Sequence, residues 1–148
     1  SFTLHNPTTL VGISLDEPHR GGLLNGSCSG LRAGYAYCSD TKPSPNYLEA
    51  IEGADLVYHE ATFTEQHLER AKSTFHSTAK QAAEQAKRAK CKYLLLGHFS
   101  SRYDDAVIHM AEASAVHPDV KAAEDGMHIV LGKWSATFGN AGKIQKPQ

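Results

Sequence analysis

The sequence predicts an α/β fold, in which helices flank a mixed or parallel sheet. Short strand-like runs alternate along the chain with helix-like segments, which is the pattern of a sheet built with connecting helices. The 148 residues are enough for one domain with a hydrophobic core. Alanines recur at helical spacing on one face of a segment that begins near residue 78, and such small residues indicate close packing on a sheet. They are Ala79, Ala82, Ala83, Ala86 and Ala89.

Residues 1–34 form the least regular part of the chain. Residues 10–15 are apolar enough to predict one strand. The following stretch, 18–34, contains five glycines and a proline, which is typical of a mobile loop. We therefore treat 1–34 as an irregular N-terminal segment, and 35–138 as the ordered α/β part.

The first half of the ordered part should contain two strands and a short helix. Aromatic residues predict a strand at 35–38, and Pro43 forbids further pairing beyond it. A short helix is expected at 46–52, where Gly53 ends it. A second strand is expected at 54–58, with His59 and Glu60 at its carboxyl end.

The second half should continue the alternation. Thr64 is a candidate N-cap for a helix that reaches Lys72. Ser77 or Thr78 should begin the long alanine-rich helix, and a buried strand at 92–97 should end at His98. The last expected elements are a helix at 105–115 capped by Asp104, one or two strands within 120–131 around a turn at Asp125-Gly126, and a disordered tail at 139–148.

The composition is that of an ordinary water-soluble protein. The net charge is −1, so no general basic excess predicts a nucleic-acid binder, and the basic stretch 80–92 is interpreted as a solvated helix face. No apolar run approaches the ~20 residues that a membrane-spanning helix needs. The first residues lack the pattern of a signal peptide. Three cysteines at no metal-ligand spacing fit a reducing cytoplasm.

Three predicted strands are each followed by a side chain of the metal-site type. These residues are Asp40, His59 and His98. Because the carboxyl ends of neighbouring strands meet at one crevice, we expect these side chains to gather in a common pocket. Imidazole and carboxylate are zinc ligands, and a carboxylate can bridge two metals. From spacing alone, however, a histidine after a strand is more often a hydrogen-bonded core or surface residue.

Four strings of the sequence resemble ribonuclease Z, an endonuclease of the metallo-β-lactamase fold that trims the 3′ end of precursor tRNA. They are Tyr-Cys-Ser-Asp-Thr-Lys-Pro at 37–43, Ala-Asp-Leu-Val-Tyr-His-Glu-Ala-Thr-Phe at 54–63, His-Ser-Thr-Ala at 76–79 and Gly-His-Phe-Ser-Ser-Arg-Tyr at 97–103. They occur in the family's order and at similar spacing. The block 122–127 resembles the family's final strand region. The implied fold is the C-terminal half of a metallo-β-lactamase αβ/βα sandwich, a mixed sheet with flanking helices.

The resemblance implies a role for each polar residue at the strand ends. Asp40 would bridge two zinc ions, although an Asx-turn is an alternative use of an aspartate there. His98 would be a ligand of one zinc ion. His59 would donate a proton to the leaving ribose oxygen, since its ordinary pKa lies near neutrality. Glu60 would orient His59, or alternatively bind the backbone of the next helix.

Further residues are implied on the substrate side. Arg102 would hold a substrate phosphate with its planar guanidinium, with a surface salt bridge as the alternative. Ser100 and Tyr103 are weaker candidates for the same face. His76, Ser77 and Thr78 would lie near the tRNA 3′ end, and they could equally cap the helix that follows.

The N-terminal segment departs from the family pattern. His5 precedes Pro7-Thr8 in a string that only approximates the family's ligand segment, so His5 is either a third metal ligand or a terminal histidine without that role. The arm that grips tRNA in many members is shortened or missing. The family's His-x-His-x-Asp-His string, which supplies most zinc ligands, does not occur in these 148 residues.

The leading hypothesis is therefore a zinc-dependent endoribonuclease that removes the 3′ trailer from precursor tRNA, with this chain holding part of a two-zinc site and being inactive alone. The complete protein is expected to be a cytoplasmic homodimer without membrane contact. One alternative is an inactive fragment or non-catalytic remnant. Another is a related phosphodiesterase of the same fold that acts on small substrates.

Overall fold

A computed structural model describes residues 11–15, 35–39, 41–131 and 136–140, and the chain forms two sheets within them. The first sheet has the strand order β2-β3-β4-β5, and each neighbouring pair is parallel. Its strands are β2 (Tyr35–Cys38), β3 (Leu56–Glu60), β4 (Tyr93–Gly97) and β5 (Val120–Ala122). This is the parallel sheet that the alternation of strands and helices predicts.

The second sheet has the order β1-β6-β7. Strand β6 (Met127–Leu131) lies between β1 (Val11–Leu15), which is parallel to it, and β7 (Ala136–Asn140), which is antiparallel. One or two strands were possible within 120–131 from the sequence, and the structure has two, at 120–122 and 127–131. The turn between them leads from one sheet to the other rather than closing a hairpin.

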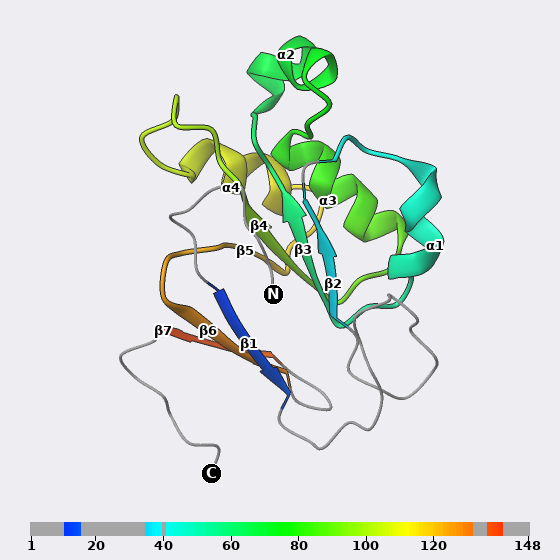
Figure 1. Cartoon of the computed structure of the whole chain (residues 1–148), viewed down its shortest axis with the longest axis vertical. Helices are drawn as coiled ribbons and strands as arrows, with labels where there is room; N and C mark the ends of the chain where they lie inside the picture. Colours follow the sequence, from blue (N-terminus) through cyan, green and yellow to red (C-terminus); the bar gives the residue numbers. More distant parts are fainter. Residues whose placement is uncertain (1–10, 16–34, 40, 132–135, 141–148) are drawn as a thin grey trace.

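The helices lie beside the four-stranded sheet (Figure 1). They are α1 (Leu48–Ile51), α2 (Leu68–Ser73), α3 (Ala79–Arg88) and α4 (Val107–Ser114), and two short 3-10 turns, η2 (Pro45–Tyr47) and η3 (Glu65–His67), precede α1 and α2. No helix of the described part is long and apolar enough to cross a bilayer. Because α3 and α4 cover one face of the sheet, the other face is left to the second sheet.

Small side chains allow α3 to approach the sheet closely. The five alanines predicted to share one face are all buried, and they pack with Val57, Leu94 and Leu96 in one core. Thr78 begins the helix with a capping box, because its side chain accepts from the Gln81 backbone while the Gln81 side chain accepts from the Thr78 backbone. The basic residues predicted to face solvent are exposed: Lys80, Lys87, Arg88, Lys90 and Lys92.

A second core lies between the two sheets. Strand side chains alternate between faces, so Leu56, Tyr58 and Leu95 point away from the helices. They pack with Met127 and Ile129 of β6. The chain therefore forms a sheet-on-sheet sandwich with helices on the outer face of the described four-stranded sheet.

The second strand lies two residues further along than predicted. It spans Leu56–Glu60 rather than 54–58, and its last two residues are paired with Leu96 and Gly97 of β4. The polar character of His59 and Glu60 suggested the end of a strand. They remain in the ladder, and both side chains are satisfied inside the protein: His59 by Tyr47 and the Glu60 carbonyl, and Glu60 largely by residues further away in the sequence.

Smaller differences concern caps and ends. Thr64 precedes η3 as expected but its side chain makes no capping hydrogen bond. Helix α4 begins at Val107, and the carboxylate of Asp105, rather than Asp104, accepts from the Val107 backbone N–H at 2.9 Å. Gly139 and Asn140, assigned to a tail, belong to β7. The segments 1–10, 16–34 and 141–148 lie outside the described residues, so the loop and the rest of the tail remain predictions.

Gly97 should be essential to the packing of the sheets. A Cβ at this position would overlap the hydroxyl and ring atoms of Tyr58, whose buried ring stacks on Tyr37 with centroids 4.8 Å apart. We expect Gly97→Ala to lower the free energy of unfolding by about 1–3 kcal/mol, because an overpacked core must shift. Urea unfolding measures the change. With Tyr58→Leu already present, Gly97→Ala should cost much less, and an equal cost in both backgrounds would contradict the assignment.

Candidate active site

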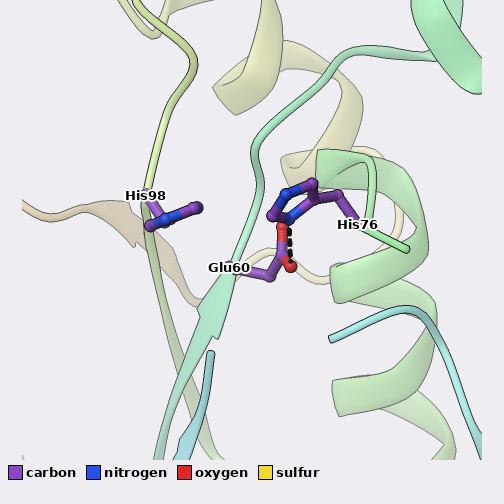
Figure 2. Close-up of side chains that lie close together, drawn as sticks. All are labelled: Glu60, His76 and His98. Atoms are coloured by element: carbon purple, nitrogen blue, oxygen red, sulfur yellow. Dashed lines mark hydrogen bonds and ion pairs between the residues drawn. The ribbon is translucent and has the colours of Figure 1, made fainter. Parts of the chain in front are cut away.

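Three polar side chains meet beyond the carboxyl ends of β3 and β4. Glu60 is the last residue of β3, His98 follows β4 directly, and His76 comes from the loop between α2 and α3 (Figure 2). One potential ligand atom from each residue lies within 4.8 Å of the others. The rings of His76 and His98 are stacked, with centroids 5.5 Å apart. We call these three residues the polar cluster.

Glu60 is a fully buried carboxylate whose two oxygens each accept two hydrogen bonds. Oε1 accepts from the Thr41 backbone N–H at 2.7 Å and from His76 Nδ1 at 2.8 Å. Oε2 accepts from the Thr62 hydroxyl at 2.5 Å and from the Ser77 backbone N–H at 3.2 Å. Four donors match the four acceptor positions of a carboxylate. They offset the cost of burying its charge, which is large for an unpaired ion.

Thr62 links Glu60 to His98. Its hydroxyl has one hydrogen, which the short contact with Glu60 uses, so it must accept from His98 Nδ1 at 2.9 Å. This identifies the tautomer in which His98 Nδ1 carries the proton and Nε2 has the lone pair. Nε2 is then the atom with which His98 would hold a metal. His98 also has a positive φ of 60°, a conformation rare outside glycine, which surrounding contacts must maintain.

His76 is held by its backbone as well as by Glu60. Helix α2 ends in a Schellman motif, in which the His76 N–H donates to the Ala71 carbonyl and the Phe75 N–H donates to the Lys72 carbonyl. A parallel bridge between Phe63 and Thr78 ties the following residues to the segment after β3. The His76 side chain keeps 22% of its surface exposed. It is therefore oriented by a buried carboxylate and still open to a ligand.

The structure places His59 elsewhere. Its ring lies on the helix-facing side of the sheet, fully buried, with Nδ1 donating to the Glu60 carbonyl at 2.7 Å. Nε2 accepts from the Tyr47 hydroxyl at 2.9 Å. Burial lowers the pKa of His59 and raises the pKa of Tyr47, so both groups are neutral near pH 7. With both nitrogens engaged and no exposed surface, the His59 ring presents no nitrogen to a molecule outside the protein.

The substrate-side candidates fall into two groups. Arg102 is exposed, its guanidinium lies 5.1 Å from the Phe63 ring centroid, and its Nε donates to the Ser100 hydroxyl at 3.3 Å. The Tyr103 hydroxyl, in contrast, is held by the backbone and side chain of Thr64 and by His67. Arg102 is thus available for an anion, whereas Tyr103 anchors the loop that carries it.

Ser77 and Thr78 act locally. The Ser77 hydroxyl donates to the Thr41 carbonyl at 2.6 Å, and Thr78 caps α3 while its hydroxyl donates to Glu65 at 2.5 Å. Both residues are buried. The capping interpretation of this string is therefore confirmed for Thr78. Of the three residues only His76 contributes its side chain to the polar cluster, and Ser77 contributes a backbone N–H that donates to Glu60.

Asp40 and His5 lie outside the described residues, so their proposed ligand roles stay predictions. In the sequence, Asp40 lies between Ser39, which follows β2, and Thr41, whose backbone N–H donates to Glu60. An open hollow begins at His98 and extends along Ser100 and Tyr103 to Ala123 and Glu124. The side chain of His98 is therefore reached from outside the protein.

The polar cluster could hold a metal ion through its imidazoles, but Glu60 is poorly suited to be a ligand. Imidazole nitrogens are common zinc ligands, and His98 is oriented by Thr62 as metal-binding histidines usually are. Every acceptor position of Glu60 is already used by the protein. These residues thus fit a metal ion that is held by His98 together with ligands from other segments. The pair of His76 and Glu60 lies beside that ion and is not needed to bind it.

Sequence reasoning did not identify Thr62 or the pairing of Glu60 with His76. Thr62 lies within a string noted for its resemblance, but its hydroxyl acts on His98, 36 positions away. No local pattern contains such a contact. The separation of His59 from Glu60 does have a local signal. Side chains alternate along a strand, so the two residues lie on opposite faces once β3 extends to residue 60.

Comparison with solved structures identifies the class of fold. The metallo-β-lactamase fold protein YhfI from Bacillus subtilis matches 70% of this chain and 39% of its own with a TM-score of 0.53, at 21% sequence identity. At that identity the match concerns the fold alone. The chain therefore has the metallo-β-lactamase type of α/β architecture that was expected.

Comparison with curated sequences confirms the resemblance to ribonuclease Z. A ribonuclease Z from Phocaeicola vulgatus is 50% identical over 103 residues, which cover 70% of this chain and 33% of the relative. A ribonuclease Z from Porphyromonas gingivalis is 53% identical over 97 residues, or 66% of this chain and 32% of the relative. This chain is thus a homologue of ribonuclease Z and spans about a third of the length of these relatives. No family model matches it.

Replacing the Glu60 carboxylate should test the hydrogen-bond network. We expect Glu60→Gln to lower the free energy of unfolding by about 3 kcal/mol, because an amide NH₂ would face two of the four buried donors. Chemical denaturation measures the change. The same substitution at the exposed Glu69, which pairs with Lys72 on the surface of α2, should change stability by less than about 0.5 kcal/mol. Equal effects at the two positions would contradict the network.

Proposed function

We propose that the chain provides part of the active site of a zinc-dependent endoribonuclease that removes the 3′ trailer from precursor tRNA. The observation that carries this proposal is the hydrogen-bonded pair of Glu60 and His76 next to His98. A histidine oriented by a carboxylate can act as a general acid, and a metal ion held by a neighbouring histidine can activate water, which are two requirements of phosphodiester hydrolysis. The homology to ribonuclease Z supports the choice of reaction and substrate.

In this proposal His76 is the proton donor to the leaving ribose oxygen, in place of His59. Its Nδ1 proton is directed to Glu60 at 2.8 Å, so Nε2 is the atom that gives the proton to the substrate. The buried charge of Glu60 stabilises the imidazolium before transfer and keeps the ring oriented after it. A positioned acid of this kind contributes roughly 10²–10⁴-fold to a rate.

Two zinc ions complete the proposed site. His98 would hold one of them through Nε2, Asp40 would bridge both, and His5 would be a further ligand. When bound, the ions supply an activated water and stabilise charge on the phosphodiester oxygens. Glu60 is assigned to His76 and not to zinc, because its oxygens accept four hydrogen bonds from the protein.

Arg102 is the proposed phosphate-binding residue. It is exposed, and Ser100 accepts hydrogen bonds from both its backbone N–H and its Nε, which directs the guanidinium. Tyr103, Ser77 and Thr78 act as positioning residues, because their described contacts hold the loops around the polar cluster. An arginine fork fits two phosphate oxygens at once.

The remaining ligands are proposed to come from outside these 148 residues. The sequence lacks a His-x-His-x-Asp-His string, and Asp40, His98 and His5 are too few to hold two zinc ions tightly. We further propose that the complete enzyme is a cytoplasmic homodimer. The two described cysteines, Cys38 and Cys91, are buried and form no disulfide with each other, which is compatible with a reducing compartment.

Substitutions of His76 and His59 should have different effects on the cleavage of precursor tRNA. With zinc and the polypeptide that completes the site, His76→Ala should lower kcat for precursor tRNA by roughly 10²–10⁴-fold. His59→Gln retains a donor and an acceptor in the same pocket and should keep most of the activity. The 148-residue chain alone should not cleave. A His59→Gln enzyme as impaired as His76→Ala, with both variants folded by circular dichroism, would contradict the assignment.

A further inference from the structure

Phe75, which is next to His76 of the polar cluster in the sequence, has a large apolar side chain that is exposed to solvent. Its ring is 65% exposed, whereas the described core residues are under a tenth exposed. It directly precedes His76, on the loop between α2 and α3. The other exposed large apolar residues described, Val107 and Ile108, belong to α4. Phe75 is therefore an isolated ring, too small a surface to be a protein interface by itself.

The backbone makes this choice of residue unusual. Phe75 occupies the left-handed position of the Schellman motif that ends α2, with φ of 60°. Glycine is the usual residue there because it has no Cβ. Helix α3 ends in the same motif, and its equivalent residue is the exposed, polar Lys90 with φ of 55°. An aromatic ring at this position of α2 is thus neither required by the turn nor used in the core.

A cation accompanies the ring. The Lys42 ammonium, from the segment after β2, lies 5.4 Å from the Phe75 ring centroid. Another aromatic–cation pair lies next to the polar cluster, since Arg102 is over Phe63 and the Phe63 ring is 6.1 Å from that of His76. Phe63 is buried, so of these two rings only Phe75 offers a face to a ligand.

We propose that Phe75 and Lys42 bind one unpaired nucleotide of the RNA substrate next to the cleaved phosphodiester. The base stacks on the Phe75 ring, and the Lys42 ammonium meets a phosphate of the same strand. A flat exposed ring beside a cation is the arrangement by which proteins bind single-stranded RNA without reading its sequence. This inference rests on the proposed function, and it adds a substrate subsite to it.

Phe75→Gly separates this role from a structural one. Glycine suits the left-handed position, so the unfolding midpoint should stay the same or rise, as it should for the matched variant Lys90→Gly. In the zinc-loaded, completed enzyme, Phe75→Gly should raise KM for precursor tRNA about tenfold or more, since a stacked base loses its platform. Phe75→Trp should restore binding to within about threefold, and Lys90→Gly should change KM less than about twofold.

Two further measurements identify the ligand. Turnover of a small chromogenic phosphodiester, which has no flanking base, should be unaffected by Phe75→Gly. A second set of substrates consists of precursor tRNAs that each have one abasic nucleotide near the cleavage site, on one side or the other. At one of these positions, removal of the base should raise KM about tenfold for the wild-type enzyme, and it should not raise KM any further for Phe75→Gly.

The outcomes distinguish the two proposals. Unchanged cleavage of precursor tRNA by Phe75→Gly, or an equal loss with the small phosphodiester, would overturn the nucleotide subsite while the proposed function stands. A completed wild-type enzyme that cleaves no precursor tRNA would overturn the proposed function and the subsite with it.

Discussion

The buried carboxylate of Glu60 is the constraint on which the site depends. It receives four donors from three segments: the turn after β2, the residue two positions beyond β3, and the residues just before α3, which supply both the His76 ring and the Ser77 backbone N–H. Only the convergence of these segments satisfies the charge. The fold and the site are thus coupled, because a shift of any one segment would leave a buried ion short of a partner.

The two faces of β3 explain how one strand serves both the core and the chemistry. Val57 and His59 face the helices, where His59 is closed off by Tyr47, while Tyr58 stacks on the inter-sheet side. Glu60 ends the strand at the level of Gly97, so its carboxylate reaches the loops above the sheet. The consecutive residues His59 and Glu60 therefore have different roles. One histidine is a neutral core residue, and the adjacent glutamate orients a different histidine.

Much of the fold could be predicted from the sequence, because its signals are local. The strand 35–38, the alanine face of α3 and the cap at Thr78 depend on neighbouring residues and agree with the structure. The end of β3 could not, because His59 and Glu60 are polar and stay in the ladder through distant partners. The sequence predicts His59 in one pocket with Asp40 and His98, whereas the structure buries it against Tyr47 on the helix-facing side of the sheet. The divergence of β5 and β6 into separate sheets was equally hidden, since a turn signal does not say what its strands pair with.

Glu60 orients His76 and is not a metal ligand in the proposed site. A crystal structure of the zinc-loaded, completed protein, with anomalous data at the zinc edge, tests it most directly. We expect a zinc peak about 2.0–2.1 Å from Nε2 of His98, with both Glu60 oxygens beyond coordination distance and Oε1 still hydrogen-bonded to His76. A zinc ion at about 2.0–2.2 Å from a Glu60 oxygen would contradict it.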